Sequence, residues 1–351
     1  MAHSLSIRQA KDLVRKIIIR GQSGGIHLPV FLHSSPGVGK SAIIRQIATE
    51  LRLPLIDLRL ASMEASVLCG VPYVHEGQLL MSIPSWFPRD PNSIGIIFLD
   101  ELPNAPFDVQ QAAYRLVLDC ELQPGVKLPV GWIVIAAGNL KTDRTGVKGI
   151  LPALGNRFAT HLHIEPNLQD FMSYGYENGI DSRIIGFLDF KREFLHKFNE
   201  NDMAFPTPRS WEAASELLKI ELTVNDHVDE MMSVLSGCVG EGVAIEFIAF
   251  LKFFNDLPSF EKIMNGGEEW EVPKTNLGLL AAATSTLIAA LRENHRSESK
   301  CRNLHKVMAQ LPEESIILIY KLLSSSSDIE MLMNVSEYTL ESYNKVKKYF
   351  E

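Results

Sequence analysis

The sequence predicts an α/β fold in the first half of the chain and a mostly helical second half. Short apolar runs typical of buried strands alternate with helical patterns as far as residue 164. A glycine-rich loop joins the first of these runs to the helix that follows it, and the strand pattern fades after Pro166. Because strands that alternate with helices usually pair in parallel, we expect a parallel sheet covered on both faces.

Five apolar runs are expected to form this sheet. They are His27–His33, Pro54–Leu60, Ile94–Leu99, Trp132–Ala137 and Phe158–Ile164. Helices are predicted after Ser4, which could cap the first of them, and over Ala42–Leu51 and Asp108–Leu118. Gly21–Gly25 is expected to end the first helix. The glycines, prolines and short alternating runs of residues 67–84 indicate a hairpin-bearing insertion.

The chain is expected to divide into three parts. Residues 1–166 would form the α/β core, with the insertion at 67–84. Residues 167–224 would form a small helical lid, interrupted at Phe205–Arg209. Residues 225–351 would form a helical C-terminal domain in which we recognise no functional motif.

The composition is that of a folded protein without a general nucleic-acid-binding surface. Apolar residues make up 46% and charged residues 22% of the 351 residues, so sizeable cores are expected. The formal net charge of −8 argues against a general nucleic-acid partner. The four cysteines are not closely spaced and are expected to be reduced core thiols. We expect a cytoplasmic protein without membrane contact, since no signal-peptide core or membrane-length apolar run is present.

The glycine-rich loop has the pattern of a phosphate-binding loop. Its residues are Ser35, Pro36, Gly37, Val38, Gly39, Lys40 and Ser41. Backbone N–H groups at the start of a helix can surround a phosphate chain. Lys40 would reach the β- and γ-phosphates, and the Ser41 hydroxyl would bind Mg²⁺. The usual pattern has glycine at position 34, where this chain has Ser34; the alternative is a glycine-rich turn without this role.

Two further strands end in polar residues at the edge where α/β sheets bind their ligands. Asp100 and Glu101 follow an apolar run, and they could hold Mg²⁺ through water and polarise the attacking water, respectively. Asn139 ends the next run and could bind the γ-phosphate or that water. The alternative is that these residues simply end strands that leave the core.

Two arginines are candidates for contact with a nucleotide. Arg157 precedes the last predicted strand and could reach the nucleotide of a neighbouring subunit. Arg209 opens a helix after Pro208 and could contact the γ-phosphate from the lid. Each could instead be a structural or surface charge.

Two other groups of side chains are expected to have no special function. His161 and His163 share one strand face, but a third ligand at metal-site spacing is missing nearby. Lys141, Arg144 and Lys148 would form a solvated loop, or else a basic loop facing a central pore near a subunit interface.

The order of these motifs over residues 27–218 resembles that of AAA+ ATPases, and within them the MoxR family of the helix-2-insert clade. The stretch Leu99–Gln111 is the most telling. MoxR-like proteins follow the acidic pair with a segment of the type IN-x-AP-x-x-x-Q. Ala105, Pro106 and either Gln110 or Gln111 fit this segment, whereas Pro103 and Asn104 depart from it.

The resemblance implies a role for each motif. Lys40 and Ser41 match the Walker A positions, Asp100 and Glu101 match Walker B, and Asn139 matches sensor 1. Arg157 matches the arginine finger that acts on a neighbouring subunit, and Arg209 matches sensor 2 of the lid. The insertion at 67–84 matches one that often faces a central pore, where Tyr73 could contact substrate or simply pack in the hairpin.

The function implied is an ATP- and Mg²⁺-dependent ATPase that remodels, activates or chaperones a partner protein. It would act as a homo-oligomeric ring, with six subunits expected, on a client or adaptor of the von Willebrand A type. Two alternatives stay open. One is an AAA+ motor or loader that acts on DNA, which the acidic charge disfavours. The other is a nucleotide-gated scaffold without turnover, which the presence of both Asp100 and Glu101 disfavours.

Overall fold

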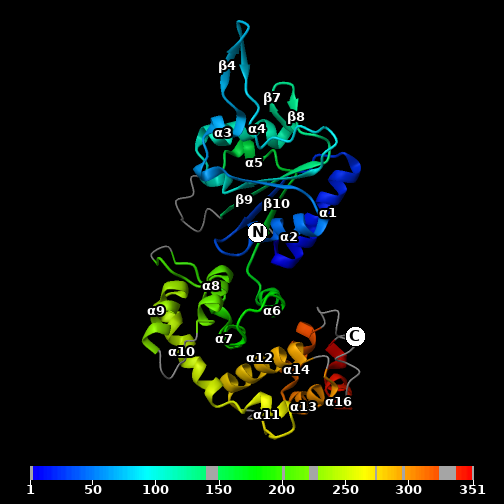
Figure 1. The fold of residues 1–351 in the computed structure, drawn as a ribbon, viewed down its shortest axis with the longest axis vertical. Helices are drawn as coiled ribbons and strands as arrows, with labels where there is room; N and C mark the ends of the chain where they lie inside the picture. The colour runs from blue at the N-terminus through cyan, green and yellow to red at the C-terminus, as the bar shows by residue number, and fades with distance from the viewer. Residues whose placement is uncertain are drawn as a thin grey trace. The chain divides into compact units, whose positions relative to one another are not determined.

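The computed structural model describes residues 3–139, 149–199, 202–220, 228–272, 275–294, 297–323 and 337–349. Within these ranges the chain forms two compact units, Met1–Pro166 and Asn167–Glu351 (Figure 1). The basic loop that contains Lys141, Arg144 and Lys148 lies outside the described residues, as does the expected boundary between residues 224 and 225.

A parallel sheet forms the centre of the first unit. All five predicted strands are present, with slightly shifted ends. They are β2 (Val30–Ser34), β3 (Leu55–Arg59), β6 (Gly95–Asp100), β9 (Trp132–Asn139) and β10 (Thr160–Ile164). A short strand that we did not predict, β1 (Ser4–Leu5), pairs with β10 and makes the sheet six-stranded, in the order β1-β10-β2-β9-β6-β3.

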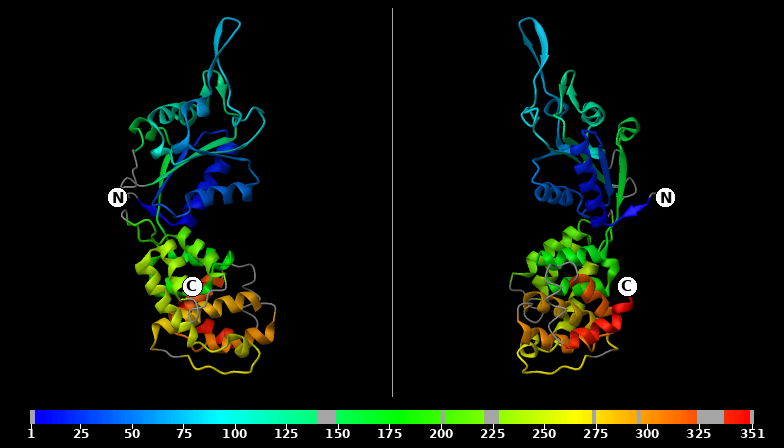
Figure 2. Two further views of the ribbon diagram at one scale, coloured as in Figure 1. Left: turned by 60° about the vertical axis from the view of Figure 1, so that its left-hand side comes forward. Right: turned by 90° about the vertical axis from the view of Figure 1, so that its right-hand side faces the viewer.

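Alternate residues of each strand face two separate cores, as the pleat of a strand requires. Phe31, Ile97 and Val134 pack in one core with α4 (Phe107–Asp119). Their neighbours in sequence pack in the other core with α1 (Ile7–Gly24) and α2 (Lys40–Leu51). Helices therefore cover both faces of the sheet, as predicted (Figures 1 and 2).

The first helix differs from the prediction at both ends. Ser6 caps it in place of Ser4, with a capping box that Gln9 completes, because Ser4 pairs in the sheet. The helix also continues through Gly21 and ends at Gly24. Gly21 is needed inside it for close packing: a Cβ at this position would lie 2.5 Å from Ile133 Cδ1.

Two antiparallel hairpins interrupt the α/β alternation. The insertion consists of the short helix α3 (Ala65–Cys69) and the strands β4 (Pro72–His75) and β5 (Gln78–Met81). Figure 2 shows this hairpin extending away from the sheet of its own unit, and Tyr73, Val74 and Leu79 are exposed on it. A second hairpin, β7 (Glu121–Gln123) and β8 (Val126–Lys127), was not predicted.

The described residues of the second unit form helices joined by loops, without a strand. Its first helices are α6 (Leu168–Glu177), α7 (Ser182–Phe190), α8 (Pro208–Leu218), α9 (Val228–Val239) and α10 (Glu241–Asn255). The later helices are α11 (Phe260–Met264), α12 (Leu277–Asn294), α13 (Glu298–Met308), α14 (Glu313–Leu323) and α16 (Glu337–Val346). One continuous core joins residues of the expected lid, such as Trp211, to residues of the C-terminal region, such as Phe247 and Leu287.

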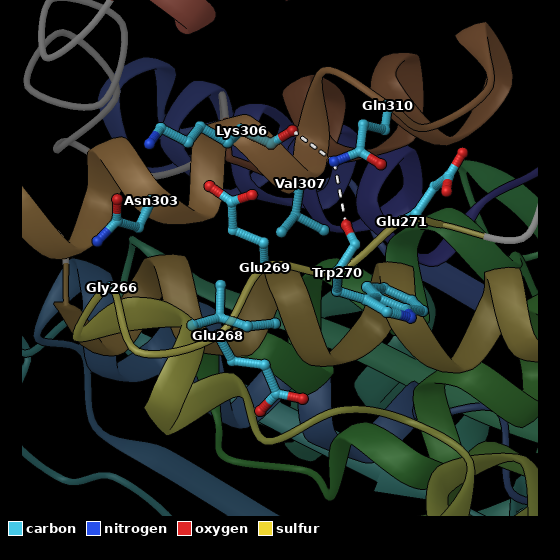
Figure 3. A pocket seen from close by; sticks show the side chains of 10 residues that line it. Gly266, Glu268, Glu269, Trp270, Glu271, Asn303, Lys306, Val307 and Gln310 are labelled. Atoms are coloured by element: carbon cyan, nitrogen blue, oxygen red, sulfur yellow. Dashed lines mark hydrogen bonds between the residues drawn. The ribbon is translucent and has the colours of Figure 1, made fainter.

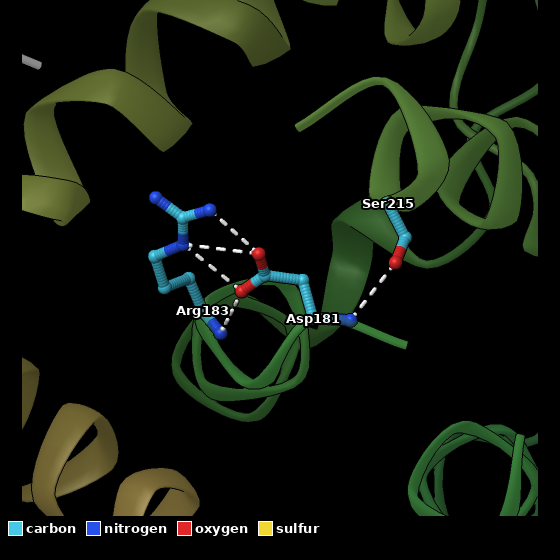
Figure 4. A network of polar contacts seen from close by, with 3 residues as sticks. All are labelled: Asp181, Arg183 and Ser215. Atoms are coloured by element: carbon cyan, nitrogen blue, oxygen red, sulfur yellow. Dashed lines mark hydrogen bonds and ion pairs between the residues drawn. The ribbon is translucent and has the colours of Figure 1, made fainter. Parts of the chain in front are cut away.

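Asp181 connects two helices of this unit, one through its side chain and the other through its main-chain N–H (Figure 4). Asp181 caps α7 and accepts hydrogen bonds from the main-chain N–H and the guanidinium of Arg183. Its own N–H donates to Ser215 Oγ of α8 at 2.9 Å. Hydrogen bonding to Asp181 also raises the pKa of Arg183. The start of α7 is thereby held against α8.

Among the described residues, no helix combines the length and the apolar character that crossing a membrane requires.

Candidate functional site

The loop between β2 and α2 leaves the start of a helix open to an anion. Gly37 and Gly39 have φ values of 74° and 113°, which residues with a side chain rarely adopt. Gly39 is the N-cap of α2 and provides no side-chain hydrogen bond to the first turn. The N–H groups of this turn and the positive end of the helix dipole therefore suit a bound phosphate.

The ammonium group of Lys40 lies among oxygen atoms although its side chain is buried. Lys40 Nζ donates to the main-chain and hydroxyl oxygens of Ser34 at 3.1 and 2.8 Å. It also donates to Ser35 O at 3.3 Å and to Asn139 Oδ1 at 3.0 Å. Ser34, where the usual pattern has glycine, is fully buried and thus supplies a partner for the lysine.

The residues predicted at three strand ends are brought together by the strand order. Strand β9 lies between β2 and β6, with Asn139 opposite Ser34 and Ala136 opposite Leu99. The Ser41 hydroxyl donates to Asp100 Oδ2 at 2.7 Å. Lys40, Ser41, Asp100 and Asn139 thus form one polar cluster at the carboxyl edge of the sheet.

Glu101 has an unusual backbone conformation next to this cluster. Its φ is 58° and its ψ is 30°, a left-handed conformation that costs a non-glycine residue about 1–2 kcal/mol. Its N–H donates to Asp100 Oδ1 at 2.9 Å. Its side chain is exposed and has no hydrogen-bond or ion-pair partner among the residues that the structure describes. The carboxylate is therefore open to water.

The residue before Asn139 packs closely against the short helix that follows Glu101. Gly138 precedes Asn139, and a Cβ on it would lie 2.3 Å from Pro103 Cγ. Pro103 belongs to the short 3₁₀ helix Leu102–Asn104, which directly follows Glu101. Pro103 is one of the residues that depart from the MoxR-like segment. It packs on β9, the strand that ends in Asn139.

The two candidate arginines are not part of the polar cluster in the described contacts. Arg157 follows α5 (Pro152–Gly155), and its guanidinium carbon lies 5.0 Å from the centre of the Tyr114 ring. Arg209 is exposed in the first turn of α8, in the second unit. Their roles toward a nucleotide stay predictions.

Our sequence reasoning did not recognise the role of Gln110. Either Gln110 or Gln111 could match the family segment, and the structure distinguishes them. Gln110 is 3% exposed and hydrogen bonds to main-chain groups, whereas Gln111 is exposed. A buried amide on a helix cannot be told from an exposed neighbour by the sequence letters alone.

Three histidines lie together on the neighbouring strands β2 and β10. The His33 ring stacks on the rings of both His161 and His163, so these two do share one strand face. His161 Nε2 is 2.9 Å from Gly155 O, and a carbonyl can only accept, so Nε2 carries the hydrogen. His161 Nδ1 lies 2.8 Å from His33 Nε2, and the two ring nitrogens share a hydrogen bond. Residue 33 is thereby connected to the turn that precedes Arg157.

Burial of the His33 ring lowers its pKa to about 4, and the positive charges possible on His163, His161 and Lys40 act in the same direction. The histidine therefore stays neutral in the folded chain under conditions that protonate it when unfolded. Since the folded pKa is the lower one, stability is present above the ordinary value of 6.5 and is lost as the pH falls toward about 4.

We expect this loss to be measurable. Between about pH 7.5 and about pH 5 the free energy of unfolding should fall by about 1 kcal/mol more for the wild type than for His33→Asn. The measurement is urea unfolding of both chains at each pH. Titrating groups without contact to residue 33, such as the buried His305, are common to both chains and cancel. Equal pH dependence of the free energy of unfolding in the two chains would contradict the lowered pKa of His33.

Two cavities lie in the second unit. One, of about 580 Å³, is lined by Gly266, Glu268, Trp270, Lys306 and Gln310 among others (Figure 3). Gln310 Nε2 donates to Trp270 O, which holds the turn against α13. The turn carries Glu268 and Glu269, and Trp270 is partly buried against Phe260. The other cavity, of about 1060 Å³, is lined by Phe198, Phe205 and Gly240 among others.

Comparison with known proteins identifies the domain that holds the polar cluster. Residues 30–165 match the family model described as ATPase family associated with various cellular activities (AAA). No curated protein matches the chain. The match covers β2 to β10 and every site residue of the first unit, so this part of the chain is similar to AAA-family ATPase domains, a family whose members bind nucleotides.

Solved structures that are similar to this chain have low identity and low TM-scores. A mutant RuvB from Thermotoga maritima is 14% identical, with 74% of this chain and 75% of that chain covered and a TM-score of 0.40. NtrX from Brucella abortus in complex with ADP is 15% identical, with coverage of 84% and 66% and a TM-score of 0.39. A putative ATPase from Cytophaga hutchinsonii is 13% identical, with coverage of 93% and 81% and a TM-score of 0.34.

Proposed function

We propose that this protein is a Mg²⁺-dependent AAA+ ATPase of the MoxR type that forms a ring and remodels or activates a partner protein. The observation that carries the proposal is the polar cluster at the carboxyl edge of the sheet. There Lys40 hydrogen bonds to Asn139 and Ser41 hydrogen bonds to Asp100, beside an exposed Glu101. This set combines a cation, a hydroxyl, two carboxylates and an amide at the start of a helix.

The residues of the cluster fit ATP and magnesium. The uncapped first turn of α2 and Lys40 would hold the phosphates. Ser41 Oγ and the Asp100 carboxylate are hard oxygen ligands of the kind that Mg²⁺ prefers, and they lie 2.7 Å apart. Bound Mg²⁺ would neutralise charge on the phosphates. Asn139 would orient the γ-phosphate or the attacking water.

Glu101 would orient and polarise that water. A carboxylate can do this only if it is not already paired, and the Glu101 side chain has no partner among the described residues. The left-handed backbone of Glu101 turns the chain directly after Asp100, so that adjacent residues can take different roles. A strained backbone at such a position agrees with a catalytic role.

A ring is proposed because two arginines would complete the site. Arg157 would reach the nucleotide of the neighbouring subunit and offset charge in the transition state. Arg209 would contact the γ-phosphate from the lid. ATP binding would bring the lid and the neighbouring subunit together, and hydrolysis would release them.

Replacing Arg157 with alanine tests the ring. We expect the ATPase rate per subunit at saturating ATP to fall at least about 100-fold, while ATP binding is retained. Arg115→Ala is a matched control, because Arg115 is an exposed arginine on α4 of the same unit. The rate should also rise with protein concentration as rings form. Full activity of a strictly monomeric Arg157→Ala chain would overturn the proposal.

The β4–β5 hairpin is the proposed contact with the client protein. Val74 and Leu79 pair across the two strands, and both side chains are more than 70% exposed. Apolar side chains that project into solvent favour contact with another protein. A client or adaptor of the von Willebrand A type could be identified by its co-purification with the Glu101→Gln chain in the presence of ATP.

The two alternatives predict different results. A DNA motor or loader would show ATPase activity that DNA stimulates and that salt suppresses. A nucleotide-gated scaffold would bind ATP and never hydrolyse it, with or without partners.

A further inference from the structure

The helix that follows the acidic strand carries two side chains that contact the segment leading to Arg157. Gln110 and Tyr114 lie four residues apart on α4, so they project from the same face of this helix. Gln110 contacts the beginning of the segment 149–157, and Tyr114 contacts its end.

All the hydrogen-bonding groups of the Gln110 amide are used on main-chain atoms. Gln110 Nε2 donates to Ala105 O at 3.2 Å and to Gly149 O at 3.1 Å. Gln110 Oε1 accepts from Leu151 N at 3.0 Å. An apolar side chain of similar size would leave these three main-chain groups without this partner in the interior. The glutamine therefore connects residue 105, just after the acidic pair, to residues 149 and 151.

The other end of the segment is held through the guanidinium group of Arg157. This group lies over the Tyr114 ring, an arrangement in which the ring face attracts the cation. Between the two attachments the chain is compact, because Gly155 N donates to Leu151 O and Arg157 N donates to Leu154 O. Displacing Leu151 would thus also displace Arg157.

We infer that Gln110 and Tyr114 are positioning residues for Arg157. Together they set the place of the arginine relative to the Asp100–Glu101 strand of its own subunit, so that it can act on the nucleotide of the neighbour. This inference rests on the proposed role of Arg157 in a ring. Neither residue contacts the polar cluster in the described hydrogen bonds, so their effect is through Arg157.

Mixed rings can separate the subunit that donates the arginine from the subunit that accepts it. Arg157→Ala chains retain Glu101 but lack the arginine, and Glu101→Gln chains have the reverse defect. We expect either chain alone to be nearly inactive and the mixture to recover ATPase activity. We then add Gln110→Leu to one chain at a time. Placed in the Glu101→Gln donor it should lower the recovered activity about 10-fold or more; placed in the Arg157→Ala acceptor it should leave that activity unchanged.

Each outcome of this experiment has a distinct meaning. Equal recovery with both placements overturns the positioning role of Gln110. Equal loss with both placements overturns it as well, because a general structural defect does not depend on the subunit. Failure of the unmodified pair to recover activity instead overturns the proposed ring function of Arg157.

A second variant and a second measurement keep the inference testable if Gln110→Leu does not fold. Tyr114→Leu removes the ring, and Tyr114→Phe keeps it as a matched control. In the donor chain we expect Tyr114→Leu to lower recovery and Tyr114→Phe to retain it; equal recovery would contradict the inference. Without nucleotide, amide hydrogen exchange in residues 149–158 should rise in Gln110→Leu more than in the β4–β5 hairpin, and an equal rise in both would count against it.

Discussion

Replacing Lys40 with alanine is expected to abolish ATP turnover, with a loss of about 1000-fold or more in the rate. Lys40 is the cation of the polar cluster, and its ammonium group already lies within 3.3 Å of oxygen atoms of Ser34, Ser35 and Asn139. Alanine would remove both the positive charge and the donor that would meet the phosphates. ATP binding, measured with a fluorescent analogue, should weaken as well.

Lys11→Ala is the matched control for this prediction. Lys11 is a lysine of the same unit, but it lies on α1, forms an ion pair with Glu50 and is not part of the polar cluster. The control should keep nearly full activity. Circular dichroism would show whether Lys40→Ala keeps the fold, since the lysine is buried. A folded Lys40→Ala chain that hydrolyses ATP at the wild-type rate would refute the proposed site.

Replacing Glu101 with glutamine is expected to block hydrolysis and to retain ATP binding. Glutamine has nearly the same shape but cannot accept a proton from the attacking water, so the turnover rate should fall about 100-fold or more. Because ATP would then remain bound, the assembled ring should persist. Single-turnover kinetics and light scattering after gel filtration with ATP would measure both effects.

Glu76→Gln is a matched control, because Glu76 and Glu101 are both glutamates with a left-handed backbone. Glu76 lies in the turn of the β4–β5 hairpin, it is exposed, and its φ of 48° is also left-handed. If glutamine with a left-handed backbone lowered activity by itself, both Glu101→Gln and Glu76→Gln would lose activity. We expect only Glu101→Gln to lose activity. Hydrolysis by Glu101→Gln at the wild-type rate would show that another group activates the water.

Most of the first unit could be predicted because its signals are local. The five main strands are apolar runs, and the carboxyl ends of parallel strands meet at one edge, so Ser41, Asp100 and Asn139 could be placed together in advance. Strand β1 was missed because a pair of residues is too short to show alternation. Sequence rules predict an early end to the first helix because glycine usually breaks helices, whereas at Gly21 close packing on Ile133 requires glycine inside the helix.

The second unit could be predicted only as helical. Its helices share one core that contains residues from the expected lid and from the expected C-terminal domain. Such a core depends on which helix faces pack together, and helix periodicity does not specify this.

By itself the sequence determined the parallel sheet and predicted the kind of chemistry at its carboxyl edge. A strand, a glycine-rich loop with Lys40 and Ser41, and strands that end in Asp100, Glu101 and Asn139 predict a phosphate-binding edge of a parallel sheet, because each signal lies within a few residues. Only the tertiary structure decided how the site is held together. The contacts of Ser34 with Lys40, of His33 with His161, and of Gln110 with Leu151 join residues distant in sequence, and Gln110 differs from Gln111 only in the direction that its side chain takes from the helix.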